Sequence, residues 1–127
     1  MKKKKFGVVW VLLSCVFLAG TPIQEQVDQK GRPLQNSIKW STASELENFG
    51  FNVYRSESEQ GPFVQINTKP IAGAGTSDEP HDYEFVDDQI EEGVIYFYYI
   101  ESISMSGQKE RFSPTIKSKP KKRENIH

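Results

Sequence analysis

Residues 87–98 read Asp87-Asp88-Gln89-Ile90-Glu91-Glu92-Gly93-Val94-Ile95-Tyr96-Phe97-Tyr98 and carry the clearest structural signal in this chain of 127 residues. An acidic turn leads to Ile90 and Gly93, and a strand opens on Tyr96. This is the pattern of a tyrosine corner, in which a tyrosine at the start of a strand hydrogen-bonds back across the edge of a β-sandwich. We therefore predict that Ile90, Gly93 and Tyr96 are structural residues that close one end of a sandwich.

The chain on both sides of this stretch alternates apolar and polar residues and is interrupted by turn residues. The pattern predicts strands at residues 37–41, 51–55, 62–66, 83–87, 94–104 and 111–118, a polar turn at 44–48, a loop at 69–80 and a hairpin turn at 106–108. Short strands at this spacing, with no convincing helix between them, are typical of a Greek-key β-sandwich. The predicted core is Ile38, Trp40, Phe51, Val53, Phe63, Ile66, Tyr83, Phe85, Ile90, Tyr96, Tyr98, Ile100 and Ile116.

The N-terminus has the anatomy of a targeting segment. Four lysines precede an uncharged apolar run from Phe6 to Leu18, and small residues follow at Ala19 and Gly20. We expect residues 1–20 to be a signal peptide or an N-terminal membrane anchor helix. Cys15 follows Leu12-Leu13-Ser14, as in a lipobox, so lipidation at Cys15 is a minor alternative. The expected organisation is then a flexible linker at 21–36, a domain at 37–118 and a basic disordered tail at 119–127.

Charge is distributed unevenly along the chain. Residues 37–116 hold 5 basic and 14 acidic residues, whereas residues 117–127 hold five basic residues and one acid. Nucleic-acid binding depends on lysines and arginines that neutralise phosphates, so an acidic domain argues against a nucleic-acid partner. Membrane contact is expected only through the N-terminal segment or the basic tail.

Residues 37–118 resemble a fibronectin type III domain. The resemblance rests on Trp40, on Phe51-x-Val53 and on the Ile90-x-x-Gly93-x-x-Tyr96 spacing, although Glu92 stands where that family usually has proline. A bacterial subgroup found in exported proteins is similar also at Asn48-x-Gly50-Phe51-x-Val53-Tyr54-Arg55-Ser56 and Tyr83-x-Phe85-x-Asp87. The resemblance implies an all-β, immunoglobulin-like sandwich of about seven strands that binds or spaces other modules, usually without catalysis.

An aromatic patch is the candidate binding surface. If Tyr96 and Tyr98 face the core, Phe97 and Tyr99 face outward, and Tyr54 joins them from the neighbouring strand. Exposed aromatic residues on a sheet often mark a protein or carbohydrate surface. The alternative is cross-strand pairing that only stabilises the sheet.

Signals of catalysis and of metal binding are weak. His81 lies near Ser77 and Asp82 but lacks a nucleophile-elbow motif, and the acidic segment 78–92 lacks the spacing of a calcium loop. No catalytic residue, metal or cofactor is therefore predicted, although calcium binding by residues 78–92 stays open.

The predicted function is that of an exported, non-catalytic binding or scaffold module, either secreted or associated with the cell envelope. Its partner would be a protein or a cell-surface glycan. Two alternatives remain: a membrane-tethered or lipidated accessory subunit that docks one envelope partner, and a carbohydrate-binding accessory module of a hydrolase system.

Overall fold

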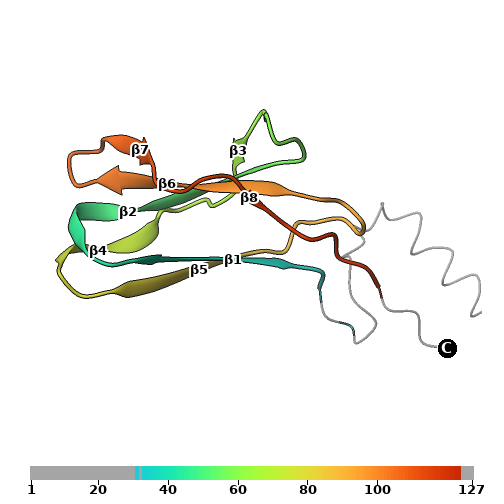
Figure 1. Ribbon diagram of the computed structural model, residues 1–127, viewed down its shortest axis with the longest axis horizontal. Helices are drawn as coiled ribbons and strands as arrows, with labels where there is room; N and C mark the ends of the chain where they lie inside the picture. Colours follow the sequence, from blue (N-terminus) through green and yellow to red (C-terminus); the bar gives the residue numbers. More distant parts are fainter. Residues whose placement is uncertain (1–30, 32, 124–127) are drawn as a thin grey trace, which may run out of the picture.

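The computed structural model describes residues 31 and 33–123, which form two packed layers of β-strands (Figure 1). The predicted signal segment, Cys15, nearly all of the linker before residue 33 and residues 124–127 lie outside the described residues. The strands are β1 (Asn36–Thr42), β2 (Glu45–Ser56), β3 (Val64–Gln65), β4 (Ile71–Ser77), β5 (His81–Asp87), β6 (Phe97–Ser104), β7 (Lys109–Arg111) and β8 (Ile116–Lys117).

Antiparallel pairing builds both layers. In the smaller layer β1 pairs with β5, with Trp40 opposite Tyr83. In the larger layer β2 pairs with β6, β3 and β4 share the other edge of β2, and β7 and β8 share the other edge of β6. The chain changes layer between β1 and β2, between β4 and β5, and between β5 and β6. The predicted all-β sandwich is confirmed.

The core lies between the two layers, because alternate residues of each strand point inward. In β1 every second residue is buried, and Trp40 stacks on Tyr83 with ring centroids 5.6 Å apart. The buried apolar cluster is Leu34, Ile38, Trp40, Phe51, Val53, Ile90, Tyr96, Tyr98 and Ile100, with Ile66, Tyr83, Phe85 and Ile116 packed against it. Phe63 was wrongly predicted as core: it is half-buried and contacts Tyr99 on the outer face.

Two predicted irregular segments are strands. The predicted polar turn at 44–48 belongs mostly to β2, where a β-bulge between Glu45 and Gly50 shifts the register. The predicted loop at 69–80 contains β4, because a glycine lets its backbone approach β2 closely. A Cβ at Gly73 would lie 2.8 Å from the backbone oxygen of Asn48.

Several strands of the larger layer are shorter than the sequence predicts. The strand predicted at 94–104 begins at Phe97, the one at 62–66 shrinks to β3, and the one at 111–118 divides into β7 and β8 around Pro114. Proline has no N–H to donate to a ladder, which accounts for the break. The hairpin turn is as predicted, with Gly107 at φ +85°.

Residues 119–123 lie against the domain, while the rest of the tail predicted at 119–127 lies outside the described residues. The backbone of Lys121 accepts a hydrogen bond from Gly93 N (2.8 Å), and Arg123 N donates to the Glu92 carboxylate (2.7 Å). The Arg123 guanidinium also lies 3.5 Å from the Glu92 carboxylate, so one ion pair joins the basic segment to the acidic turn.

Candidate functional site

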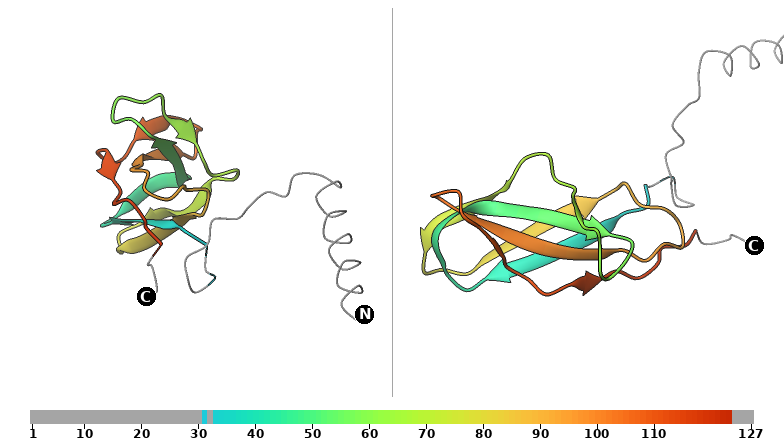
Figure 2. Two further views of the ribbon diagram at one scale, coloured as in Figure 1. Left: turned by 90° about the vertical axis from the view of Figure 1, so that its right-hand side faces the viewer. Right: turned by 90° about the horizontal axis from the view of Figure 1, so that it is seen from above.

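The predicted corner residues lie in the connection between β5 and β6, at one end of the sandwich (Figure 2). The Tyr96 hydroxyl accepts a hydrogen bond from Glu91 N (2.9 Å), Ile90 is buried, and Gly93 adopts φ +79°. A left-handed conformation favours glycine at this position. This is the geometry of a tyrosine corner, and it leaves these residues no exposed reactive group.

A buried polar network lies beneath the corner. Asp87 is 3% exposed and accepts hydrogen bonds from Arg55 Nη1 (3.0 Å) and from the Tyr98 hydroxyl (2.7 Å), and Asn36 donates to Tyr98. Burial, together with the hydrogen bond to Asp87, raises the pKa of Tyr98 well above its usual value. Asp87 begins the acidic turn at residues 87–92 in the sequence, but its side chain is buried and does not belong to the exposed part of that turn. The network links β1, β2, β5 and β6 and therefore stabilises the packing of the two layers.

The predicted aromatic patch is only partly assembled. Tyr54 and Tyr99 stack in parallel across β2 and β6, with centroids 4.7 Å apart and 7° between planes. The Arg111 guanidinium lies 4.4 Å from the centroid of the Tyr99 ring, on the β7 side, and Phe63 meets Tyr99 edge-on. Both faces of Tyr99 are therefore covered by neighbouring side chains, which is the arrangement of a stabilising cross-strand ladder.

Phe97 stands apart from this ladder. It lies opposite Ser56 and Lys117 and makes no ring contact with another described residue. The three predicted patch residues, Tyr54, Phe97 and Tyr99, thus share a sheet face but do not form one flat platform.

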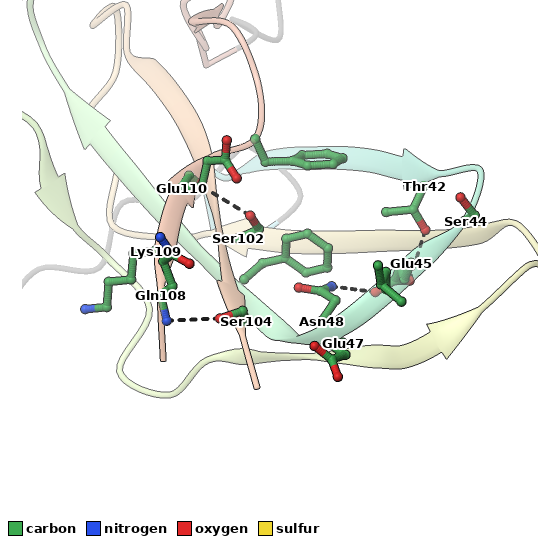
Figure 3. Close-up of a pocket in the computed structure, with 13 residues that line it drawn as sticks. Thr42, Ser44, Glu45, Glu47, Asn48, Ser102, Ser104, Gln108, Lys109 and Glu110 are labelled. Atoms are coloured by element: carbon green, nitrogen blue, oxygen red, sulfur yellow. Dashed lines mark hydrogen bonds between the residues drawn. The ribbon is translucent and has the colours of Figure 1, made fainter. Parts of the chain in front are cut away.

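A cleft lies at the opposite end of the sandwich, between the bulged start of β2 and the β6–β7 hairpin (Figure 3). Its volume is about 490 Å³. Phe112, which is 42% exposed, packs edge-on against Phe51 with centroids 5.5 Å apart and supplies an apolar wall. Leu46, 80% exposed, supplies another apolar lining group. The cleft therefore combines apolar surface with a polar rim.

The bulge that shapes the cleft contains a conformational outlier. Glu47 adopts φ +47°, and its backbone groups bond outward to the Thr76 hydroxyl and to Met105 N. Left-handed conformations of residues other than glycine cost energy and cluster at functional sites, and bulges redirect side chains. Here the bulge leaves Leu46 and Glu47 exposed beside the cleft.

The inner wall of the cleft is held by the Glu45 carboxylate. It accepts hydrogen bonds from Asn48, from Ala74 N (3.1 Å), and from the hydroxyls of Thr42 (3.0 Å) and Tyr83 (2.5 Å). Burial alone would raise the pKa of Glu45, but these hydrogen bonds outweigh it and lower the pKa to about 2. Burial and the bond to Glu45 raise the pKa of Tyr83 to about 12.

Several polar side chains on the cleft rim have no partner within the protein. In the described part of the chain, the side chains of Ser44, Glu47, Gln108, Lys109 and Glu110 make no hydrogen bond or ion pair. Figure 3 shows them at the two sides of the hollow. Unpartnered donors and acceptors around an apolar floor are what a ligand site needs.

Other candidate chemistry is sparse among the described residues. His81 Nε2 lies 3.0 Å from the Ser77 hydroxyl, but Asp82 bonds instead to Ser41 (2.6 Å), so these three side chains do not form a triad. Residues 31 and 33–123 contain no group of three or more His, Cys, Asp or Glu side chains arranged around a metal position. The same residues contain no helix with the length and apolarity to cross a membrane.

Sequence reasoning missed both the cleft and the buried Asp87. A signal for Asp87 was present, because Tyr83, Phe85 and Asp87 share the inward phase of one strand. The cleft had no such signal, since a bulge in β2 and a distant hairpin form it together.

The fold and the cleft define an all-β sandwich domain with an open, mixed polar and apolar hollow at one end. No family model matches the chain, and no solved structure matches it. The chain is similar to an amylopullulanase of Thermoanaerobacter thermohydrosulfuricus, with 30% identity over 102 residues. That match covers 79% of this chain and 6% of the enzyme. It therefore concerns a small part of a much larger protein.

Proposed function

We propose that this chain is a non-catalytic accessory module that binds carbohydrate in the cleft between β2 and the β6–β7 hairpin. The observation that carries the proposal is the convergence of unpartnered polar side chains around the exposed ring of Phe112. Sugars offer hydroxyls to polar groups and C–H faces to aromatic rings, so this combination suits them.

The similarity to an amylopullulanase supports a neutral glucan as the ligand. That enzyme is named for action on amylose and pullulan, and the matched region is 6% of its length. A segment of this size in a large hydrolase is in keeping with an accessory module rather than a catalytic domain. The fibronectin type III resemblance and the signal-like N-terminus agree with such a module in an exported protein.

Affinity electrophoresis in gels that contain soluble starch or pullulan tests the proposal. We expect the full chain to be retarded, and Gln108→Ala and Glu110→Ala to weaken binding about tenfold, because each removes one hydrogen bond to the ligand. Phe112→Ala should abolish retardation, since it removes the ring from the wall of the cleft.

Phe97→Ala is the matched control, because Phe97 is a half-buried phenylalanine on the outer face and lies away from the cleft. Retardation should persist in this variant. An unmodified chain that migrates equally with and without glucans would refute the proposal, as would equal losses in Phe97→Ala and Glu110→Ala.

A protein ligand at the same end is the second candidate. Leu46, Phe49 and Met105 are all more than half exposed near this end, and exposed apolar groups favour protein contacts. If Phe49→Ser or Met105→Ser abolishes capture of an envelope protein while glucan binding is unaffected, the module docks protein there, because neither residue lines the cleft.

A further inference from the structure

A second hollow lies at the other end of the domain, between β1 and the segment that begins with β8. Its volume is about 380 Å³. Its lining includes Ile38, which belongs to the core, and Ile116, which packs against the core. Lysines of β1, of β8 and of the segment after β8 also line it. Figure 1 shows the C-terminal segment leaving β8 and descending past the end of β1. We name this hollow the lysine groove.

Four lysines line the lysine groove: Lys39, Lys117, Lys119 and Lys121. All four are exposed, and none forms an ion pair with another described residue. No acidic residue is among the described residues that line it. This is unexpected in a domain where residues 37–116 hold 14 acids and 5 bases. Glu84 lies opposite Lys39 in the β1–β5 pairing, but no acidic residue lines the groove beside the other three lysines. Like charges repel, so this local excess of positive charge favours an anionic partner.

Residues 118–121 are hydrogen-bonded to the domain, which distinguishes this groove from a solvated run of charge. Ser118 exchanges hydrogen bonds with the backbone of Tyr96 (2.8 and 2.9 Å), and Lys121 O accepts from Gly93 N (2.8 Å). These lysines therefore project from a backbone that is already fixed by hydrogen bonds, so ligand binding carries no entropic cost for ordering that backbone.

The shape of the groove favours a chain over a flat surface. A planar membrane meets protruding charges, whereas here lysines from two segments border a hollow lined by apolar Ile38 and Ile116. Among the described strands, β1 pairs only with β5, so its other edge offers backbone N–H and C=O groups. Hydroxyls could bond to that edge, sugar C–H groups could cover the partly exposed Ile116, and acidic substituents could pair with the lysines.

We propose that the lysine groove binds a linear anionic polysaccharide, a sugar chain that carries carboxylate or phosphate groups. This site is separate from the cleft and goes beyond the neutral-glucan function. It adds attachment to an acidic polymer, so that the two ends of the domain hold two different ligands.

Isothermal titration of the full chain tests this proposal with three soluble probes: polygalacturonate, linear polyphosphate and neutral pullulan. We expect polygalacturonate to bind, more weakly as salt is added, because it carries both sugar rings and carboxylates. The triple variant Lys117→Gln, Lys119→Gln, Lys121→Gln should lose about tenfold in affinity for polygalacturonate, as three exposed ion pairs would supply. Binding of polyphosphate without polygalacturonate would show that charge alone is recognised and would overturn the proposal.

Lys39→Gln and Lys69→Gln form a matched pair, since each removes one charge from an exposed lysine but only Lys39 lines the groove. Polyanion affinity should fall for Lys39→Gln and be unchanged for Lys69→Gln and for Phe112→Ala. Equal losses in both lysine variants would mean nonspecific charge and would overturn the proposal.

Two further results would also overturn it. One is the absence of binding to either polyanion. The other is binding to phosphatidylglycerol-containing vesicles but to neither soluble polymer, because that identifies a membrane surface as the ligand. Loss of pullulan binding bears on the cleft alone, so failures of the two sites are distinguishable.

Discussion

At the residue scale, position 87 shows how one side chain acquires a role that its neighbours do not share. Asp87 and Asp88 are adjacent, yet Asp87 is buried under Arg55 and Tyr98 while Asp88 is exposed. The alternation of inward and outward residues along β5 explains this difference, because Asp87 is the last inward residue of the strand.

Replacing Asp87 by asparagine should destabilise the domain by about 2–4 kcal/mol, because it leaves the Arg55 guanidinium without its carboxylate. The measurement is urea denaturation at neutral pH. Asp88→Asn is the control, with an expected change of no more than about 0.5 kcal/mol. Equal effects of the two substitutions would contradict the role assigned to Asp87.

At the element scale, β2 organises the larger layer. It pairs with β6 on one edge and with β3 and β4 on the other, and its bulge opens the cleft. The β2–β4 contact depends on close approach: a Cβ on Gly50 would collide with the carbonyl oxygen of Ile71. The candidate binding surface thus rests on a contact between two backbones.

Gly50→Ala should therefore cost more stability than Gly93→Ala. At Gly93 an added Cβ meets no atom within 4 Å, so the expected cost is the left-handed strain of about 1–2 kcal/mol. At Gly50 the added Cβ forces β2 and β4 apart, so we expect the free energy of unfolding to fall by about 3 kcal/mol or more. Thermal and urea unfolding measure both variants. A larger loss for Gly93→Ala than for Gly50→Ala would show that β4 moves away from β2 at little cost.

At the scale of the whole molecule, the Glu45 carboxylate joins the two layers. Its donors come from β2 and β4 in one layer and from Tyr83 of β5 in the other. The two candidate sites lie at opposite ends of this sandwich, the cleft beside Glu45 and the lysine groove beside the C-terminal segment.

Acid should weaken the domain through Glu45. Since its folded pKa is lowered from 4.5 to about 2, its stabilising contribution is complete above about pH 4.5 and is lost as the pH falls toward 2. We expect Glu45→Gln to be less stable than the unmodified chain at pH 7, and the difference to shrink across this window. Urea denaturation between pH 2 and 7 measures it, with exposed Glu84→Gln as control. A constant difference at all pH values would contradict this account.

Much of the fold was predictable from local patterns. Alternation in residues 37–41 and 83–87 indicated β1 and β5, and the Ile90, Gly93 and Tyr96 spacing indicated the corner geometry. β4 was not predictable, because glycine-rich segments read as loops unless a neighbouring backbone is known to approach them. Phe63 was misplaced for a related reason: nothing in its short segment indicates which layer it faces.

The sequence by itself determined the all-β class, most of the core and the gathering of basic residues after Lys117. Strand periodicity and net charge are local properties, so neighbouring residues suffice to reveal them. Only the tertiary structure decided that Tyr99 is covered by Tyr54 and Arg111, that a cleft forms beside Glu45, and that Lys39 lines the same hollow as the C-terminal lysines. Each of these depends on segments far apart in the chain, which only the packing of the two layers brings together.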